Sequence, residues 1–291
     1  MSSTLHPDAI NALVYGDHGA PLEILGPHRK SDTEMVVRTF QPHAKSIAFI
    51  PHQSQQRVPM RRIHDAGLFE IEVPSVPANE QHLYRFELSS YENELTQIYD
   101  PFAFPPLLTD FDLHLFGEGM HLDIYERMGA HLREVDGVQG VNFAVWAPNA
   151  QRVSVIGEFN HWDGRIHPMQ MRGKSGVWEI FIPGLSEGTI YKYEIKSWNK
   201  GYAAEKSDPY GFFAELRPKT ASVVKDLNGY SWGDDDWMKA RSSHSALNQP
   251  MAIYELHMGS WKRKSGWQWV TYREMADELI PYLREMGYTH V

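Results

Sequence analysis

The apolar and polar positions between residues 142 and 157 alternate along two consecutive segments. Residues 142–146 (NFAVW) and 152–157 (RVSVIG) have a two-residue period, and residues 147–150 (APNA) separate them. This period, with β-branched and aromatic side chains, is typical of strands, and a Pro-Asn pair is typical of a turn. The pattern predicts two strands joined by a turn. The loop that follows, residues 158–164 (EFNHWDG), places two aromatic side chains among polar ones.

The region before this strand pair is also dominated by short strand-like segments. They occupy residues 35–40, 45–50, 67–73 and 82–88. Several short strands at intervals of roughly 8–12 residues are typical of a β-sandwich. Residues 8–15 have apolar side chains at helical spacing and are followed by Gly16, a plausible stop signal. We therefore expect a helical lead-in over residues 1–27 and a first β-sandwich over residues 28–112.

The layout of this first region is repeated later in the chain. Six pairs of short motifs correspond, each pair 103 to 109 residues apart: GPH at 26–28 with GAH at 129–131, FQP at 40–42 with WAP at 146–148, GLFE at 67–70 with GVWE at 176–179, VP at 73–74 with IP at 182–183, YRF at 84–86 with YKY at 191–193, and DPF at 100–102 with DPY at 208–210. A nearly constant offset predicts a tandem duplication. The second β-sandwich would span residues 129–224, with residues 113–128 as a linker.

The two copies differ in the loop after their second strand. The second copy has GEFNHWD at residues 157–163, whereas the first has PHQSQQR at residues 51–57. A loop that only filled the core should be needed in both copies. The difference therefore favours a specialised role for the loop of the second copy.

The character of the chain changes after Pro250, which ends a second predicted linker at residues 225–250. Residues 251–257 (MAIYELH) have the nearly continuous apolar character of a buried parallel strand. Thr271 and Glu274 form a capping-box pattern before an amphipathic helix that Gly287 should end. Residues 288–291 (YTHV) would begin another strand. Residues 251–291 thus predict the opening of a βαβ unit, whose sheet faces need further chain to cover them.

Composition and charge narrow the functional classes. The 291 residues carry a net charge of −9, which argues against binding nucleic acid by bulk electrostatics. The absence of cysteine excludes disulfides and thiol catalysis. No signal peptide or membrane-spanning run is apparent, so we expect a cytoplasmic protein without membrane contact. No motif for a metal or a cofactor stands out. The chain is rich in aromatic residues, with 9 Trp, 14 Tyr and 13 Phe, which suit β-sheet cores and also stacking on sugar rings.

Several of these motifs together resemble a known family. Residues 143–149 (FAVWAPN), 157–163 (GEFNHWD), 190–193 (IYKY) and 206–210 (KSDPY) resemble the glucan-binding β-sandwich of the α-amylase superfamily. Residues 253–261 (IYELHMGSW) resemble the first barrel strand of the bacterial glycogen (1,4-α-glucan) branching enzymes. The resemblance covers the whole chain, as the amino-terminal portion of such an enzyme. It implies a mainly β fold of two tandem immunoglobulin-like β-sandwiches, followed by the first strand-helix unit of an incomplete (β/α)₈ barrel.

The resemblance also implies a function. Enzymes of this family cut an α-1,4-glucan chain and transfer it to a 6-hydroxyl, with one carboxylate as nucleophile and another as acid/base. In the family these residues lie on later barrel strands, at the carboxyl ends where such sites occur. No catalytic residue can be assigned in this sequence, and we expect the chain alone to be inactive. Glu255 and His257 face the same side of the first predicted barrel strand, but a structural role is the better interpretation. A fragment or a truncated product would explain the incomplete barrel.

By position in the related sandwich, the candidate glucan-binding residues are Trp162, Asn160, Lys192 and Trp198. Trp162 would either stack on a sugar ring or brace its loop against Phe159. Trp146 and Trp178 fall within strands and are expected in the core. The expected partners are α-1,4-glucans such as glycogen, amylose and maltooligosaccharides, bound by a monomer. Two alternatives remain open, namely a stand-alone glucan-binding protein and a structural module that positions a partner.

Overall fold

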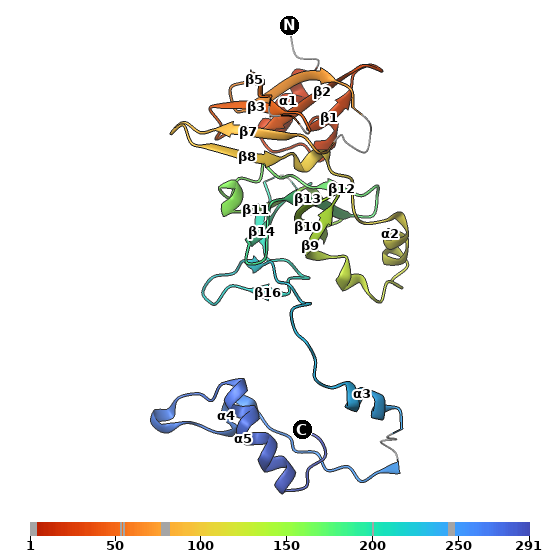
Figure 1. Cartoon of the computed structure of the whole chain (residues 1–291), viewed down its shortest axis with the longest axis vertical. Coiled ribbons are helices and arrows are strands. Elements are labelled where there is room, and N and C mark those ends of the chain that lie inside the picture. Colours follow the sequence, from red (N-terminus) through yellow and green to blue (C-terminus); the bar gives the residue numbers. More distant parts are fainter. Residues whose placement is uncertain (1–4, 53, 55, 77–81, 200, 244–247) are drawn as a thin grey trace. The chain divides into compact units, whose positions relative to one another are not determined.

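A computed structural model describes residues 5–52, 54, 56–76, 82–199, 201–243 and 248–291 of the chain. The chain divides into two compact units, Met1–Gly229 and Tyr230–Val291. The structure is mainly β, with few helices (Figure 1). No helix among the described residues combines the length and the hydropathy that a membrane crossing requires.

The first unit begins with a helix and a pair of antiparallel sheets, which we call the first sheet pair. One sheet has the strand order β1-β2-β6-β5 and the other β4-β3-β7-β8. The bounds are α1 (Pro7–Val14), η1 (Pro21–Glu23), β1 (Gly26–Arg29), β2 (Glu34–Phe40), β3 (Ser46–Ile50), β4 (Val58–Pro59), β5 (Arg61–His64), β6 (Leu68–Pro74), β7 (Arg85–Ser89), β8 (Leu95–Tyr99) and η3 (Pro101–Ala103). Both sheets contribute to one buried cluster, with Val37 and Phe69 from the first sheet and Phe49 and Phe86 from the second. The four strands expected here are confirmed within a few residues, as is the helix expected at residues 8–15.

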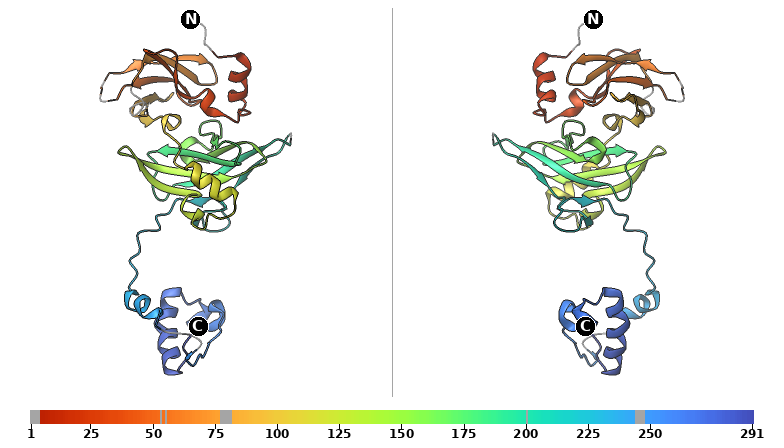
Figure 2. Two further views of the ribbon diagram at one scale, coloured as in Figure 1. Left: turned by 90° about the vertical axis from the view of Figure 1, so that its right-hand side faces the viewer. Right: turned by 90° about the vertical axis from the view of Figure 1, so that its left-hand side faces the viewer.

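The second pair of sheets, the second sheet pair, follows in the same unit. Its strand orders are β12-β13-β10-β9 and β11-β14-β17-β16, and β15 also pairs with β14. The bounds are α2 (Asp110–Gly117), η4 (Ile124–Glu126), β9 (Gly129–Val135), β10 (Val138–Trp146), β11 (Ala150–Gly157), η5 (Glu158–Asn160), β12 (Gln170–Met171), β13 (Val177–Pro183), β14 (Ile190–Ser197), β15 (Ala203–Lys206), β16 (Phe213–Ala214) and β17 (Ser222–Val223). Figure 2 shows the strands of the first sheet pair (orange) stacked above those of the second (green).

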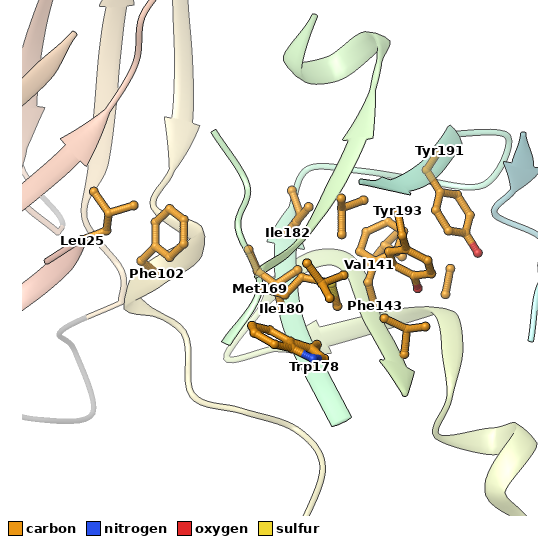
Figure 3. Close-up of a cluster of buried hydrophobic side chains, with 14 of the residues drawn as sticks. Leu25, Phe102, Val141, Phe143, Met169, Trp178, Ile180, Ile182, Tyr191 and Tyr193 are labelled. Atoms are coloured by element: carbon orange, nitrogen blue, oxygen red, sulfur yellow. The ribbon is translucent and has the colours of Figure 1, made fainter. Parts of the chain in front are cut away.

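The core of the second sheet pair follows from the two-residue period of its strands. Alternate residues of β10, including Phe143, face the same buried cluster as Trp178 of β13 and Tyr193 of β14. The same cluster includes Leu25, which directly precedes β1, and Phe102 of η3, which follows β8 (Figure 3). The two sheet pairs therefore share buried apolar surface, and burial of such surface is the dominant stabilising term in folding.

The motifs that repeat in the sequence occupy equivalent places in the two sheet pairs. The order β1-β2-β6-β5 has its counterpart in β9-β10-β13-β12. Gly26 and Gly129, both with positive φ, each begin the first strand of a sheet pair. A Cβ atom there would lie 2.7 Å from the carbonyl oxygen of Phe102 or 2.9 Å from that of Tyr210, so only glycine fits both the conformation and the space.

A buried Tyr–Asp pair is also repeated. The hydroxyl of Tyr84 donates to Asp100 Oδ2 at 2.5 Å, and that of Tyr191 donates to Asp208 Oδ2 at 2.6 Å. In both copies the other carboxylate oxygen accepts the backbone N–H two residues later. The pair thus fixes the turn after β8 to the core of the first sheet pair and the turn after β15 to the core of the second.

The second unit contains α3 (Asp235–Arg241), α4 (Met258–Trp261), η7 (Ser265–Trp267) and α5 (Tyr272–Glu285). The capping box is confirmed, because Thr271 N–H donates to Glu274 Oε2 at 2.9 Å and Glu274 N–H donates to Thr271 Oγ1 at 3.4 Å. The regular strand expected at residues 251–257 is wrong, as is the one at residues 288–291. The two segments make only an isolated parallel bridge between Ile253 and His290. A buried parallel strand needs neighbours on both sides, and only one neighbouring segment is present in this unit.

Candidate functional site

The aromatic segment after β11 forms a loop that returns along the same strand, and we call residues 158–168 the Trp162 loop. The N–H of Trp162 donates to the Gly157 carbonyl at 2.9 Å, which closes the tight turn at the end of β11. The segment then runs back beside β11, because Val155 N–H donates to His167 O at 3.1 Å and Met169 N–H donates to Val153 O at 2.8 Å. The loop thus satisfies backbone groups on the edge of β11 that β14 does not pair.

Asn160 anchors this loop from inside. Its side chain is 1% exposed, and its Oδ1 accepts the Gly157 N–H at 2.9 Å. Its Nδ2 donates to the Val155 carbonyl at 2.8 Å and to His167 Nδ1 at 2.9 Å. Buried amides need such partners, and here both ends of the amide are occupied by the protein itself. Asn160 therefore shapes the loop and has no free surface for a ligand in this conformation.

The next two residues have an unusual backbone conformation. His161 and Trp162 have φ values of 56° and 59°, in the left-handed region. For residues other than glycine this conformation costs roughly 1–2 kcal/mol per residue and persists only where the surroundings enforce it. Its consequence is that the Trp162 side chain does not fold into the core but remains 38% exposed. The loop thus presents one partly exposed aromatic ring on a well-anchored turn.

Lys192 lies at the same end of the sheet as this turn. It sits on β14 opposite Ile156, next to the pair formed by Gly157 and Tyr191. Its side chain is 20% exposed, and its Nζ lies 3.3 Å from Glu205 Oε2. Its partly buried ammonium group thus provides a hydrogen-bond donor at the same end of the strand pair as the partly exposed Trp162.

Trp198 lies at the opposite end of β14. It follows Ser197, which pairs with Ala150 at the start of β11, and it is 70% exposed. At about 3.3 Å per residue, the length of β11 separates the two ends by roughly 20–25 Å. The structure therefore brings Trp162 and Lys192 to one end of the β11–β14 pair and does not bring Trp198 to them.

The two tryptophans expected in the core have different environments. Trp178 is 1% exposed and its Nε1 donates to the Ala147 carbonyl at 3.0 Å, so that expectation is confirmed. Trp146 is 52% exposed and packs edge-on against Phe116, with ring centroids 6.1 Å apart, so that expectation is wrong. The two-residue period that points Val145 into the core points Trp146 to the other face, and this signal was present in the sequence.

The end of the Trp162 loop carries a charged pair. Arg165 binds Asp163 in a fork, with Nε 2.9 Å from Oδ1 and Nη2 2.7 Å from Oδ2. Burial opposes ionisation of Asp163, but the hydrogen bonds from Arg165 outweigh it and hold the pKa of Asp163 below its usual range. The pair is thus ionised near neutral pH and closes the loop.

The part of the chain that the structure describes holds no cluster of metal-binding side chains. No group of three or more His, Asp or Glu side chains in that part could hold a metal ion. Glu255 and His257 are exposed, and the His257 Nδ1 lies 3.0 Å from the hydroxyl of Ser260 in its own turn. A hollow of about 340 Å³ lies on another part of the second sheet pair and includes none of the predicted site residues.

Two family models match separate parts of the chain. Residues 6–102 match the N-terminal domain of the alpha-1,4-glucan branching enzyme GlgB, and residues 127–211 match carbohydrate-binding module 48, described as the isoamylase N-terminal domain. The first match coincides with α1 and the first sheet pair. The second match contains the Trp162 loop, Lys192 and Trp198.

Curated relatives match nearly the whole chain. A 1,4-alpha-glucan branching enzyme GlgB from Thermosynechococcus vestitus is 48% identical over 99% of this chain and 40% of the relative. One from Rubrobacter xylanophilus is 48% identical over 98% of this chain and 38% of the relative. The chain therefore spans about 40% of the length of these relatives.

A solved structure of a pullulanase from Anoxybacillus sp. LM18-11 covers 91% of this chain and 38% of its own, with 16% identity. Its TM-score of 0.35 is too low to support an inference. In contrast, the GlgB family model and the curated GlgB relatives name the same kind of enzyme. The resemblance indicated by the sequence is thereby confirmed: this chain is similar to the amino-terminal portion of the bacterial 1,4-α-glucan (glycogen) branching enzymes.

Proposed function

We propose that the chain is the amino-terminal part of a 1,4-α-glucan branching enzyme and that its own task is to bind glucan. The observation that carries the proposal is the coincidence of the carbohydrate-binding-module match at residues 127–211 with a loop that exposes Trp162 on a rigid turn. The whole enzyme would transfer segments of α-1,4-glucan to form α-1,6 branches. Its two catalytic carboxylates, about 5–5.5 Å apart in a retaining enzyme, would lie on later barrel strands and not among these residues.

The same proposal assigns the architecture. The two sheet pairs are two tandem immunoglobulin-like β-sandwiches at residues 28–112 and 129–224, derived from one duplicated ancestor. Residues 1–27 are the lead-in, and residues 113–128 and 225–250 are linkers. Residues 251–291 supply the first strand-helix unit of a (β/α)₈ barrel. The regular strand would form once the neighbouring barrel strands pair with residues 251–257.

In this proposal the candidate residues of the second sheet pair have distinct roles. The ring of Trp162 stacks on the apolar face of a glucose unit, and Lys192 donates to its hydroxyls. Asn160 contributes by holding the turn and not by touching sugar. Trp198 offers a second, separate contact for a longer chain. The partners are α-1,4-glucans such as glycogen and amylose, bound in the cytoplasm by a monomer that needs neither nucleic acid nor a membrane.

Retention on an amylose affinity gel tests the binding site. We expect maltooligosaccharides to bind with a Kd near millimolar, about −4 kcal/mol, and Trp162→Ala to abolish most of the retention. Trp267→Ala is the matched control, because Trp267 is 83% exposed in the other unit. Unchanged retention of Trp162→Ala would refute the site.

The iodine–amylose complex tests the assignment of catalysis. We expect the 291-residue chain, produced by itself, to leave the spectrum of the complex unchanged. Measurable transfer by this chain would show that the residues described above include a catalytic centre.

A further inference from the structure

The Trp162 loop is held from outside by segments that precede the second sheet pair. Arg165, which closes the loop through Asp163, also donates from Nη1 to the carbonyl of Val14 at 3.4 Å. Its guanidinium lies 5.6 Å from the ring centroid of Phe40, the last residue of β2. One side chain of the loop thus contacts both α1 and the first sheet pair.

The carbonyl end of α1 depends on cations from the second sheet pair. The last turn of α1 contains no basic residue of its own. Lys196 of β14 donates from Nζ to the carbonyls of Tyr15 and Gly16 at 3.2 Å each, and lies 2.6 Å from Asp17 Oδ1. A helix carboxyl end leaves unpaired carbonyls with partial negative charge, so these cations stabilise the docked position of α1.

A ring contact adds a further link between the first sheet pair and the loop. His43 lies against His161, with ring centroids 4.4 Å apart, and its Nε2 lies 3.9 Å from Asp163 Oδ2. His161 is the first of the two residues with left-handed backbone. The strained turn is therefore held by Asn160 from inside and by Arg165 and His43 from outside.

We propose that Arg165 is a positioning residue through which α1 and the first sheet pair keep Trp162 in its glucan-binding conformation. The inference rests on the proposed function of the Trp162 loop and extends it. Residues that precede the second sheet pair set the glucan affinity of that pair without touching the sugar. When α1 is loosened, the Arg165 side chain loses the Val14 carbonyl, the Asp163 fork loses its support, and the strained turn is free to relax.

A double-mutant cycle tests this coupling in the full chain. Leu13 of α1 is 2% exposed in the shared cluster, so it cannot contact glucan, and Leu13→Ala should loosen α1. We expect Leu13→Ala and Arg165→Ala each to weaken maltoheptaose binding about fivefold or more, the usual scale of a coupling between sites. The double variant should bind no more weakly than Arg165→Ala alone. Additive losses, or a Leu13→Ala variant with unchanged affinity, would overturn the proposal.

Two further variants separate positioning from general destabilisation. Ile47→Ala creates a similar defect in the separate cluster of the first sheet pair and should leave binding unchanged. Arg165→Lys keeps a cation near the Val14 carbonyl and should recover part of the affinity that Arg165→Ala loses. Amide hydrogen exchange should quicken in residues 158–168 for Leu13→Ala but not for Ile47→Ala. Equal effects of the Leu13 and Ile47 variants would contradict the proposal.

If the Leu13→Ala variant does not fold, a Gly19→Ala variant takes its place. A Cβ atom at Gly19 would lie 2.3 Å from the carbonyl oxygen of Gln151, so Gly19→Ala should push the segment after α1 away from β11. It should weaken binding in the same way as Leu13→Ala. Trp162→Ala distinguishes a failure of the positioning role from a failure of the proposed binding site. If it abolishes binding while the Gly19 and Arg165 variants bind normally, only the positioning role fails, whereas an unaffected Trp162→Ala refutes the proposed site itself.

Discussion

The amide of Asn160 donates to Nδ1 of His167 at 2.9 Å, and both side chains are buried. The imidazole must therefore be neutral, with its proton on Nε2, because a protonated Nδ1 could not accept this bond. Burial lowers the pKa of His167 to about 4. Protonation of His167 would therefore break the hydrogen bond with Asn160, which anchors the Trp162 loop.

The first prediction concerns acidification. Because the pKa of His167 is lower in the folded than in the unfolded chain, its contribution to stability is fully present above about pH 6.5 and is lost as the pH falls towards 4. Glucan binding should weaken only as the pH approaches 4, where His167 of the folded chain takes up a proton and Asn160 loses its acceptor. His167→Gln, which cannot become charged, should flatten this dependence, whereas His114→Gln at an exposed position should not. Urea unfolding and maltoheptaose titration between pH 7.5 and 3.5 provide the measurements.

The second prediction concerns Asp100, whose effect on the pH dependence of stability is opposite to that of His167. Burial raises the pKa of Asp100 to about 6, although the Tyr84 hydroxyl and the Phe102 N–H both favour the charged form. A group whose folded pKa is raised contributes stability below its unfolded pKa, near 4, and loses it as the pH rises through 6.

Wild-type protein should therefore show partly cancelling effects of Asp100 and His167. Asp100→Asn should make the loss of stability on acidification steeper, and His167→Gln should make it shallower or reverse it. Urea unfolding at half-unit pH steps separates the two. Parallel pH profiles of both variants would show that one of these groups does not titrate as stated.

The third prediction concerns Glu179, a buried carboxylate that fixes the connection between the sheet pairs. Its Oε1 accepts the N–H groups of Leu107 and Leu108 at 2.8 Å each, and Arg172 binds its Oε2. Glu179→Ala leaves Arg172 and two backbone donors without this acceptor. We expect it to lower the free energy of unfolding by about 3–5 kcal/mol, the usual cost of breaking a buried pair.

Two controls accompany the Glu179 variant. Glu179→Gln keeps an acceptor for the backbone N–H groups and should cost less than Glu179→Ala. Glu205→Ala removes an exposed pair with Lys192 and should cost less than about 1 kcal/mol. Denaturant unfolding monitored by fluorescence gives all three values. A Glu179→Ala variant as stable as Glu205→Ala would contradict the anchoring role.

The strands and the repeat could be predicted from the sequence because both depend on local signals. The two-residue period of residues 142–157 reports which side chains face the core, and it corresponds to β10 and β11. The paired motifs correspond to positions with a strict local requirement, such as the glycines at 26 and 129 with positive φ. A backbone conformation that only glycine adopts easily selects glycine at that position. Such a position can be recognised in the sequence without knowing which residues lie near it in space.

The details of the candidate site could not be predicted in the same way. Nothing local marks Asn160 as buried, because its partner His167 lies seven residues later across the loop. The contact of Arg165 with Val14 joins residues 151 positions apart. Residues 251–257 illustrate the opposite limit. Their apolar pattern is evident, but a regular strand requires pairing neighbours that no local pattern supplies.

The last prediction follows from the separation of Trp162 and Trp198 along the β11–β14 pair. Residues more than about 7–10 Å apart without shared partners contribute independently, within roughly 0.3–0.5 kcal/mol. Trp162→Ala and Trp198→Ala should therefore have additive effects on amylose binding, and only the Trp162 change should affect maltotriose, which is too short to span both ends. Isothermal titration of the single and double variants with both ligands provides the measurement. Strong non-additivity with maltotriose would mean that the two rings act on the same sugar, which the position of Trp198 beyond Ser197 does not allow.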